Sequence, residues 1–229
     1  MEFIPGINMR IRHWEKASKE FKSGMLQKLA QQLRLLRSIP APEPSYYGRI
    51  DYQSWVPPMG MIGSEALTAP LGPFYSKEPF IESMWTRVLH KLLANDPSDS
   101  WNPHYELGLR YLKQTLSRFE GWEPKMTHFD IKLDNMVFRP IKPQKWWQPP
   151  EIPTDPSELK AEDYEVVLID WGEACWMPAW VETQAMRGRT PQRDGLWMLE
   201  MSKGLEDFYF PELGLVKILK EILGIWIGR

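Results

Sequence analysis

The stretch that decides the fold is His128-Phe129-Asp130-Ile131-Lys132-Leu133-Asp134-Asn135, together with Val166-Val167-Leu168-Ile169-Asp170 further along the chain. Met136–Phe138 and the first four residues of the second stretch are rich in β-branched and aromatic side chains, which is typical of two short strands. Antiparallel pairing brings the start of one strand beside the end of the other. We therefore predict a β-hairpin with Asn135 and Asp170 at the same end.

The polar residues around this hairpin predict a phosphoryl-transfer site. Asp130 is the candidate catalytic base, because a carboxylate beside a bound phosphate donor orients an acceptor hydroxyl and takes its proton. Asn135 and Asp170 offer a neutral and an anionic oxygen, and Mg²⁺ prefers few protein oxygens besides phosphate and water, so both are predicted to bind the metal and its nucleotide. Lys132 would contact the transferred phosphate as a point charge. His128 has no second His or Cys at ligand spacing, so we expect its ring to tie the loop together.

Composition sets the broad class of protein. The chain has 229 residues, a net charge of -2 and one cysteine, Cys175. This length fits one domain, and the charge argues against nucleic acid or an acidic membrane as a partner. The lone cysteine suits a reducing compartment, and no apolar run approaches the length of a membrane span. We expect one soluble, cytoplasmic domain over residues 1–229.

Apolar periodicity predicts a mainly helical α+β chain. We expect one helix that ends near Ser38, a second that begins after Ser76 and a third that begins near Pro103. Two more are expected over Gly195–Gly204 and Glu212–Ile225. Residues 40–75 are expected to form a long ordered loop. Six prolines in residues 139–164 indicate an insertion, interpreted as a mobile surface excursion.

The octet and Asp170 resemble the protein-kinase-like superfamily, in its aminoglycoside phosphotransferase and choline-kinase-like branch of fungal type. His128, Asp130 and Asn135 match the catalytic-loop pattern of that branch. Asp170 matches the metal-binding acid of its Asp-Trp-Glu or Asp-Phe-Gly element, although this chain has Asp-Trp-Gly-Glu. That difference, together with Lys132, is closer to protein kinases.

Other segments extend this resemblance over nearly the whole chain. Glu2–Gly6 looks like the segment that leaves the hinge between lobes, Leu29–Pro44 like the first helix of the C-terminal lobe, and Trp176–Trp180 like the turn after the metal-binding acid. The resemblance implies a C-terminal lobe with a small β-hairpin and with the N-terminal lobe absent. It also implies ATP- and Mg²⁺-dependent phosphoryl transfer to a hydroxyl of a small-molecule substrate. Asp130 would be the base, and Asn135 and Asp170 would be the Mg²⁺ ligands.

The expected absence of an N-terminal lobe has two consequences. Phe3, Ile4 and Ile7 should form an uncovered apolar edge, which a second copy of the chain or another partner would cover. Phosphate charge would also be less well neutralised, which predicts impaired transfer. Two alternatives therefore stay open: a non-catalytic binding protein of the pseudokinase type, and a repurposed small-molecule enzyme that does not use ATP.

Overall fold

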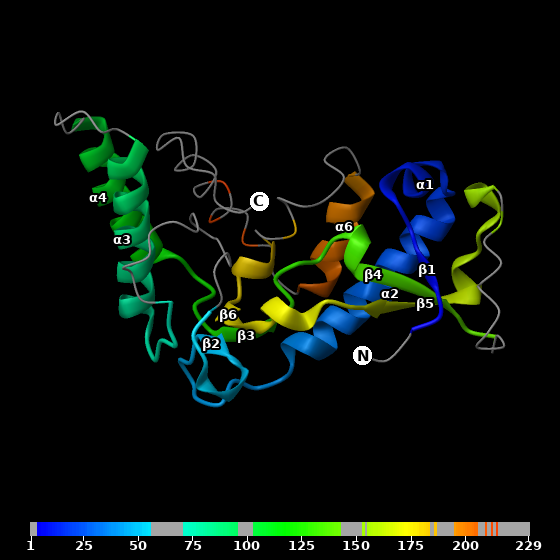
Figure 1. Cartoon of the computed structure of the whole chain (residues 1–229), viewed down its shortest axis with the longest axis horizontal. Helices are drawn as coiled ribbons and strands as arrows, with labels where there is room; N and C mark the ends of the chain where they lie inside the picture. Colours follow the sequence, from blue (N-terminus) through cyan, green and yellow to red (C-terminus); the bar gives the residue numbers. More distant parts are fainter. Residues whose placement is uncertain are drawn as a thin grey trace. The chain divides into compact units, whose positions relative to one another are not determined.

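A computed structural model gives the fold of residues 4–55, 71–95, 103–142, 153, 155–183, 186, 195–205, 209, 212 and 214. These residues form an α+β structure in which helices outweigh strands and two small antiparallel sheets are present (Figure 1). The chain divides into two compact units. The first comprises Met1–Ser38, Asp130–Gly172 and Ala185–Phe208, and the second comprises Ile39–Phe129, Glu173–Gln184 and Tyr209–Arg229.

The sheet of the first unit contains the predicted strand pair. Its order is β1 (Ile7–Asn8), β4 (Met136–Pro140) and β5 (Tyr164–Leu168), and all neighbours are antiparallel. Met136 lies opposite Leu168, so the predicted pairing is confirmed and extends over five residues of each strand. The carboxyl end of β5 consequently lies beside the amino end of β4.

The third strand of this sheet, β1, was not predicted. Ile7 and Asn8 pair with Phe138 and Val137 of β4. Ile7 is only 3% exposed. The expectation that Ile7 contributes to an uncovered apolar edge is therefore wrong, because this residue packs within the sheet. Ile4 is half-buried, and Phe3 lies outside the described residues.

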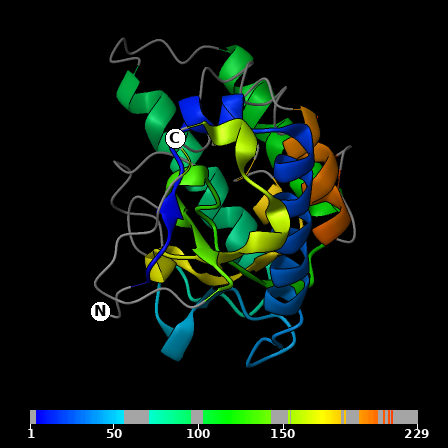
Figure 2. The same ribbon diagram turned by 90° about the vertical axis from the view of Figure 1, so that its right-hand side faces the viewer.

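Three helices pack in the first unit: α1 (Ile11–Lys16), α2 (Lys19–Arg37) and α6 (Gly195–Gly204). Extended backbone at Ala17 and Ser18 separates α1 from α2, and the Ser18 hydroxyl caps α2 by accepting a hydrogen bond from the Phe21 amide at 3.1 Å. The predicted end near Ser38 is confirmed. Helices α2 and α6 lie side by side in both views (Figures 1 and 2).

An aromatic core connects these helices to β4. The Trp14 ring stacks on Phe138 with ring centroids 6.2 Å apart, and Phe21 meets the edge of Phe138 at 5.8 Å. Trp197 of α6 lies 6.0 Å from Trp14. Trp14, Phe21, Phe138 and Trp197 are almost completely buried. This aromatic packing around Phe138 holds β4, the strand that follows the predicted site, in the core of the first unit.

Side chains of α2 cover the outer edge of β5. Lys28 donates hydrogen bonds to the carbonyl oxygens of Ala161, at 2.7 Å, and Tyr164, and Gln32 donates to that of Val166. The approach is close at Gly24, where an added Cβ would lie 2.4 Å from the Cβ of Ala161. Two carbonyl groups on the outer edge of β5 thus accept hydrogen bonds within the same unit.

Part of the predicted mobile insertion packs against helices of the first unit. Pro156–Glu158 (η3) and Ala161–Asp163 (η4) form single 3-10 turns; η3 contacts α1, η4 contacts α2, and Leu159 between the two turns is buried. Most other described residues of this part are exposed, which agrees with the predicted surface position, and its mobility stays a prediction. Residues 143–152 and 154 lie outside the described residues.

The second unit has a sheet that the sequence did not predict. Its order is β2 (Gly48–Arg49), β6 (Cys175–Pro178) and β3 (Pro124–Thr127), again antiparallel. The strand β3 ends directly before His128, the first residue of the octet. The strand β6 covers Trp176–Pro178 of the segment expected to be a turn, and the chain turns only at Ala179 and Trp180.

Two predicted helices of the second unit are confirmed as α3 (Lys77–Asn95) and α4 (Pro103–Arg118), which pack against each other. The unit also has an aromatic cluster in which the rings meet mainly edge to face: Tyr47, Trp55, Phe74, Phe80, Phe119, Trp122 and Trp180. Nearly all of the expected helix Glu212–Ile225 lies outside the described residues. Among the helices that the structure describes, none has the length and apolar character needed to cross a membrane.

Candidate functional site

The loop that enters β4 carries three of the predicted site residues. Ile131 and Leu133 are buried, whereas Lys132 between them is half-buried and Asp134 is exposed. Leu133–Asn135 form a 3-10 turn (η2), in which the Asn135 amide donates to the Lys132 carbonyl oxygen at 3.0 Å. The buried Ile131 and Leu133 anchor the loop in the core, whereas Lys132 and Asp134 between and after them reach the surface.

Asp130, Lys132 and Asn135 form one hydrogen-bonded group. One carboxylate oxygen of Asp130, Oδ2, accepts hydrogen bonds from Lys132 Nζ and from Asn135 Nδ2, both at 2.8 Å. Asn135 Nδ2 also donates to the backbone oxygen of Asp130 at 2.9 Å. Asp130 and Asn135 are 6% and 5% exposed. The plane of the carboxylate is thus fixed by a cation and by an amide that itself belongs to the predicted metal site.

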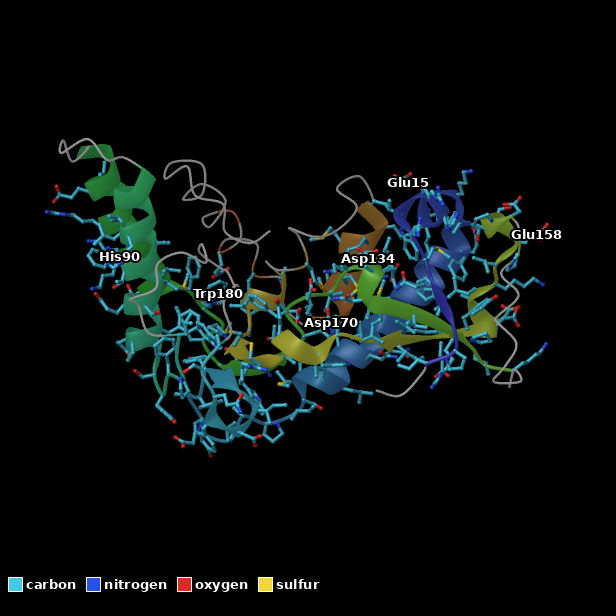
Figure 3. All side chains as sticks on the ribbon, viewed as in Figure 1. Glu15, His90, Asp134, Glu158, Asp170 and Trp180 are labelled. Atoms are coloured by element: carbon cyan, nitrogen blue, oxygen red, sulfur yellow. The ribbon has the colours of Figure 1, made fainter. Side chains whose placement is uncertain are left out.

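Asp170 follows β5 at the same end of the sheet as this group. The amide of Ile169 donates to the backbone oxygen of Asn135 at 3.0 Å, which ties the residue before Asp170 to the loop. Asp170 is exposed, and its φ of 65° lies in the left-handed region, which is uncommon for a residue other than glycine. Figure 3 labels Asp170 beside the end of β5 and Asp134 at the start of β4. The structure therefore brings Asp130, Lys132, Asn135 and Asp170 to one region of the first unit.

A buried glutamate that the sequence analysis did not single out holds the backbone before Asp130. In the second unit, Glu182 Oε2 accepts a hydrogen bond from the His128 amide at 2.7 Å, and Oε1 accepts one from the Phe129 amide at 3.1 Å. Glu182 and His128 are both 0% exposed. Phe129 has a φ of 69°, a strained conformation for an aromatic residue. The carboxylate of Glu182 thus stabilises a backbone geometry that the loop would not adopt by itself.

The structure gives His128 a backbone contact with Glu182. Its main-chain amide is bound by Glu182, as described, and its side chain is completely buried. The expectation that its ring ties the loop together stays a prediction.

The sequence signal for Glu182 was its position directly after the apolar run Ala179-Trp180-Val181, all of whose side chains are buried. A charge in such a run requires buried hydrogen-bond donors.

The donor set fits Mg²⁺ better than a transition metal. Among the residues described, no three His, Cys, Asp or Glu side chains gather in a group able to hold a metal ion. Magnesium does not require such a group, because it binds through one or two protein oxygens and keeps phosphate and water as its other ligands. The side-chain nitrogen of Asn135 donates to Asp130, so the side-chain oxygen is the atom of Asn135 that could bind a metal ion.

The single cysteine takes no part in this chemistry. Cys175 lies in β6 of the second unit and is 0% exposed. Burial is the main reason that the pKa of its thiol is raised well above the ordinary value of 9.0, and the carboxylates of Glu182 and Glu173 raise it further. The thiol is therefore protonated near neutral pH and is neither a nucleophile nor a soft metal ligand.

Comparisons with known proteins identify no relative. No family model matches the chain, and neither a curated protein nor a solved structure matches it.

Proposed function

We propose that this chain is an aminoglycoside-phosphotransferase-like protein that transfers a phosphoryl group from ATP, with Mg²⁺, to a hydroxyl of a small molecule. Asp130 acts as the base that orients the acceptor hydroxyl and accepts its proton. Asn135 and Asp170 would hold Mg²⁺, which would supply charge neutralisation to the phosphates. Lys132 would contact the transferred phosphate in the nucleotide-bound state.

The observation that carries this proposal is the hydrogen-bonded group of Asp130, Lys132 and Asn135, joined to the residue before Asp170. Four residues with the chemistry of phosphoryl transfer come from two segments about 40 positions apart in sequence, and the β4–β5 pairing brings them to one end of a sheet. The almost buried carboxylate of Asp130 accepts hydrogen bonds from an ammonium and an amide on the same oxygen, which fixes its orientation as a base would require.

The residues suit a magnesium–nucleotide ligand in charge as well as in type. Asp170 supplies one exposed carboxylate, Asn135 supplies a neutral oxygen, and Lys132 supplies the cation. Bound Mg²⁺ would hold the phosphate chain and withdraw charge from it. The protein side chains would supply the other roles. Asp130 positions the acceptor hydroxyl, and the buried Ile131 and Leu133 keep the loop in place.

Measurements of ligand binding and of phosphate transfer distinguish the role of Asp170 from that of Asp130. Mg²⁺–ATP should raise the melting temperature of the unsubstituted chain, because a ligand that binds only the native state stabilises it. Asp170→Asn should abolish this shift by removing the anionic ligand. Asp130→Asn should keep most of the shift and lose phosphate transfer to a panel of hydroxyl-bearing acceptors, since the base acts on the acceptor.

Asp134→Asn is the matched control. Asp134 lies in the same turn and has the same charge, but its side chain is exposed. It should retain both the shift and the transfer. The proposal fails if millimolar Mg²⁺–ATP gives neither a thermal shift nor a calorimetric signal with the unsubstituted chain, and one of the two alternatives that do not use ATP then takes its place.

We further infer a C-terminal lobe of the protein-kinase-like fold and a cytoplasmic location. The pairing of a catalytic-loop segment with a strand that ends in an acid supports the first inference. The single, buried cysteine and the net charge of -2 support a reducing compartment and a partner other than nucleic acid. The partner expected from the chemistry of the site is the small-molecule acceptor.

A further inference from the structure

The side chain of Asn8 bridges the carbonyl groups of the residues before and after Asn135. Its amide nitrogen, Nδ2, donates to the backbone oxygen of Asp134 at 2.7 Å and to that of Met136 at 3.3 Å. These contacts span more than 120 positions of sequence. Asn8 is the last residue of β1, so its side chain supplies donors beyond the point where the backbone pairing with β4 stops.

The residues before Asn8 seat this segment tightly on β4. An added Cβ at Gly6 would lie 2.3 Å from Val137 Cγ1 and 2.8 Å from the Phe138 backbone oxygen, so only glycine permits this approach. Ile7 is buried within the sheet. Gly6 and Ile7 therefore hold Asn8 at a defined position along β4.

The turn that carries Asn135 is consequently fixed from both neighbouring strands. From the side of β1, Asn8 holds the carbonyl groups before and after Asn135. From the side of β5, the Ile169 amide holds the carbonyl group of Asn135 itself. Three successive carbonyl groups are thus bound, and the side chain of Asn135 is left to contact Asp130.

We propose that Asn8 is a positioning residue that holds the turn Leu133–Asn135 in the geometry needed to bind Mg²⁺–nucleotide. The effect on metal affinity rests on the proposed function, whereas the effect on the turn does not. Asn8 touches neither metal nor substrate in this assignment; it acts through the backbone of Asp134 and Met136. Loss of its two donors should let the turn open without unfolding the unit.

Hydrogen exchange in the full chain tests the positioning directly. Asn8→Asp keeps the shape of the side chain and replaces the donor by an acceptor, and Asn8→Ala removes both. In each variant the amides of Asn135 and Ile169 should exchange roughly tenfold faster, as expected for the loss of two hydrogen bonds. Amides in the middle of α2, such as that of Leu29, should keep their rates. Gln27→Ala is the control, because it removes an exposed amide that bonds to Ser23 within α2, away from the turn.

Calorimetric titration of the same variants with Mg²⁺–ATP gives the second measurement. We expect the affinity of the Asn8 variants to fall roughly tenfold and that of Gln27→Ala to stay unchanged. Unchanged exchange at Asn135 and Ile169, or equal acceleration throughout α2, overturns the positioning role. Faster exchange with unchanged nucleotide affinity overturns the link to the metal. If the unsubstituted chain binds no Mg²⁺–ATP, the proposed function and the link to the metal both fail, and exchange alone decides whether Asn8 holds the turn.

Discussion

Replacing Glu182 by glutamine should destabilise the second unit through the backbone of His128 and Phe129. The carboxylate accepts a hydrogen bond on each oxygen, at 2.7 and 3.1 Å, and is 0% exposed. Bonds to a charged acceptor contribute about 1.5–3 kcal/mol each. The amide of glutamine keeps one acceptor and turns an NH₂ group toward the other backbone amide. That amide becomes a buried, unsatisfied donor, at a cost of about 1–3 kcal/mol.

Taken together, these changes should lower the free energy of unfolding by about 3 kcal/mol, since one bond is lost and the other is weakened. For a chain of this length the corresponding fall in melting temperature is about 6–12 °C. The left-handed backbone of Phe129 adds to the effect, because its strain of about 1–2 kcal/mol is no longer offset by the carboxylate.

Urea unfolding followed by tryptophan fluorescence measures this difference. Glu158→Gln is the matched control, because this glutamate is exposed in η3 (Figure 3) and should change the free energy by less than about 0.5 kcal/mol. A Glu182→Gln variant as stable as Glu158→Gln would refute the role assigned to the buried carboxylate.

Two further predictions concern packing and pH. Gly24→Ala should destabilise by about 1 kcal/mol, because crowding against the Cβ of Ala161, 2.4 Å away, outweighs the helix propensity gained. In an Ala161→Gly background the same substitution should stabilise by about 0.5–1 kcal/mol; urea unfolding that shows the same sign in both backgrounds would contradict the contact. Above pH 9.0 the free energy of unfolding should fall by up to about 1.4 kcal/mol per pH unit, since burial raises the folded-state pKa of Cys175 and the unfolded chain therefore loses its proton first. Burial also raises the pKa of Tyr46 and Tyr47 from 10.0 to about 12, which extends the fall above pH 10. Cys175→Ala should flatten the slope between pH 9 and 10, and denaturation curves with equal slopes for both chains would count against this assignment.

The parts of the structure that could be predicted are those in which the signal is local. The β-branched run Val166-Val167-Leu168-Ile169 predicted its strand, and the spacing of Asp130 and Asn135 predicted a common site, because both patterns lie within a few residues. Helices α3 and α4 were predicted from periodicity and from the proline near each start. The structure brings together the predicted site residues Asp130, Lys132 and Asn135.

The contacts that were missed join distant segments. Glu182 lies 54 positions from His128, and a glutamate in a helical turn is ordinarily a surface charge. Asn8 lies 126 positions from Asp134. The strand β6 begins with Cys175-Trp176-Met177, which lacks β-branched residues, and ends at Pro178, so only its pairing with β2 and β3 makes it a strand.

The contacts of Lys28 and Gln32 with β5 impose a matched spacing on helix and strand. Four helical residues rise about 6 Å, and two strand residues span about 6.7 Å. The distance along α2 from Lys28 to Gln32 therefore matches the distance along β5 from Tyr164 to Val166, whose carbonyl groups accept their hydrogen bonds. Inserting or deleting one residue between Lys28 and Gln32 would rotate one side chain by about 100° away from its carbonyl. Length changes between Lys28 and Gln32, or between Tyr164 and Val166, should therefore not be tolerated.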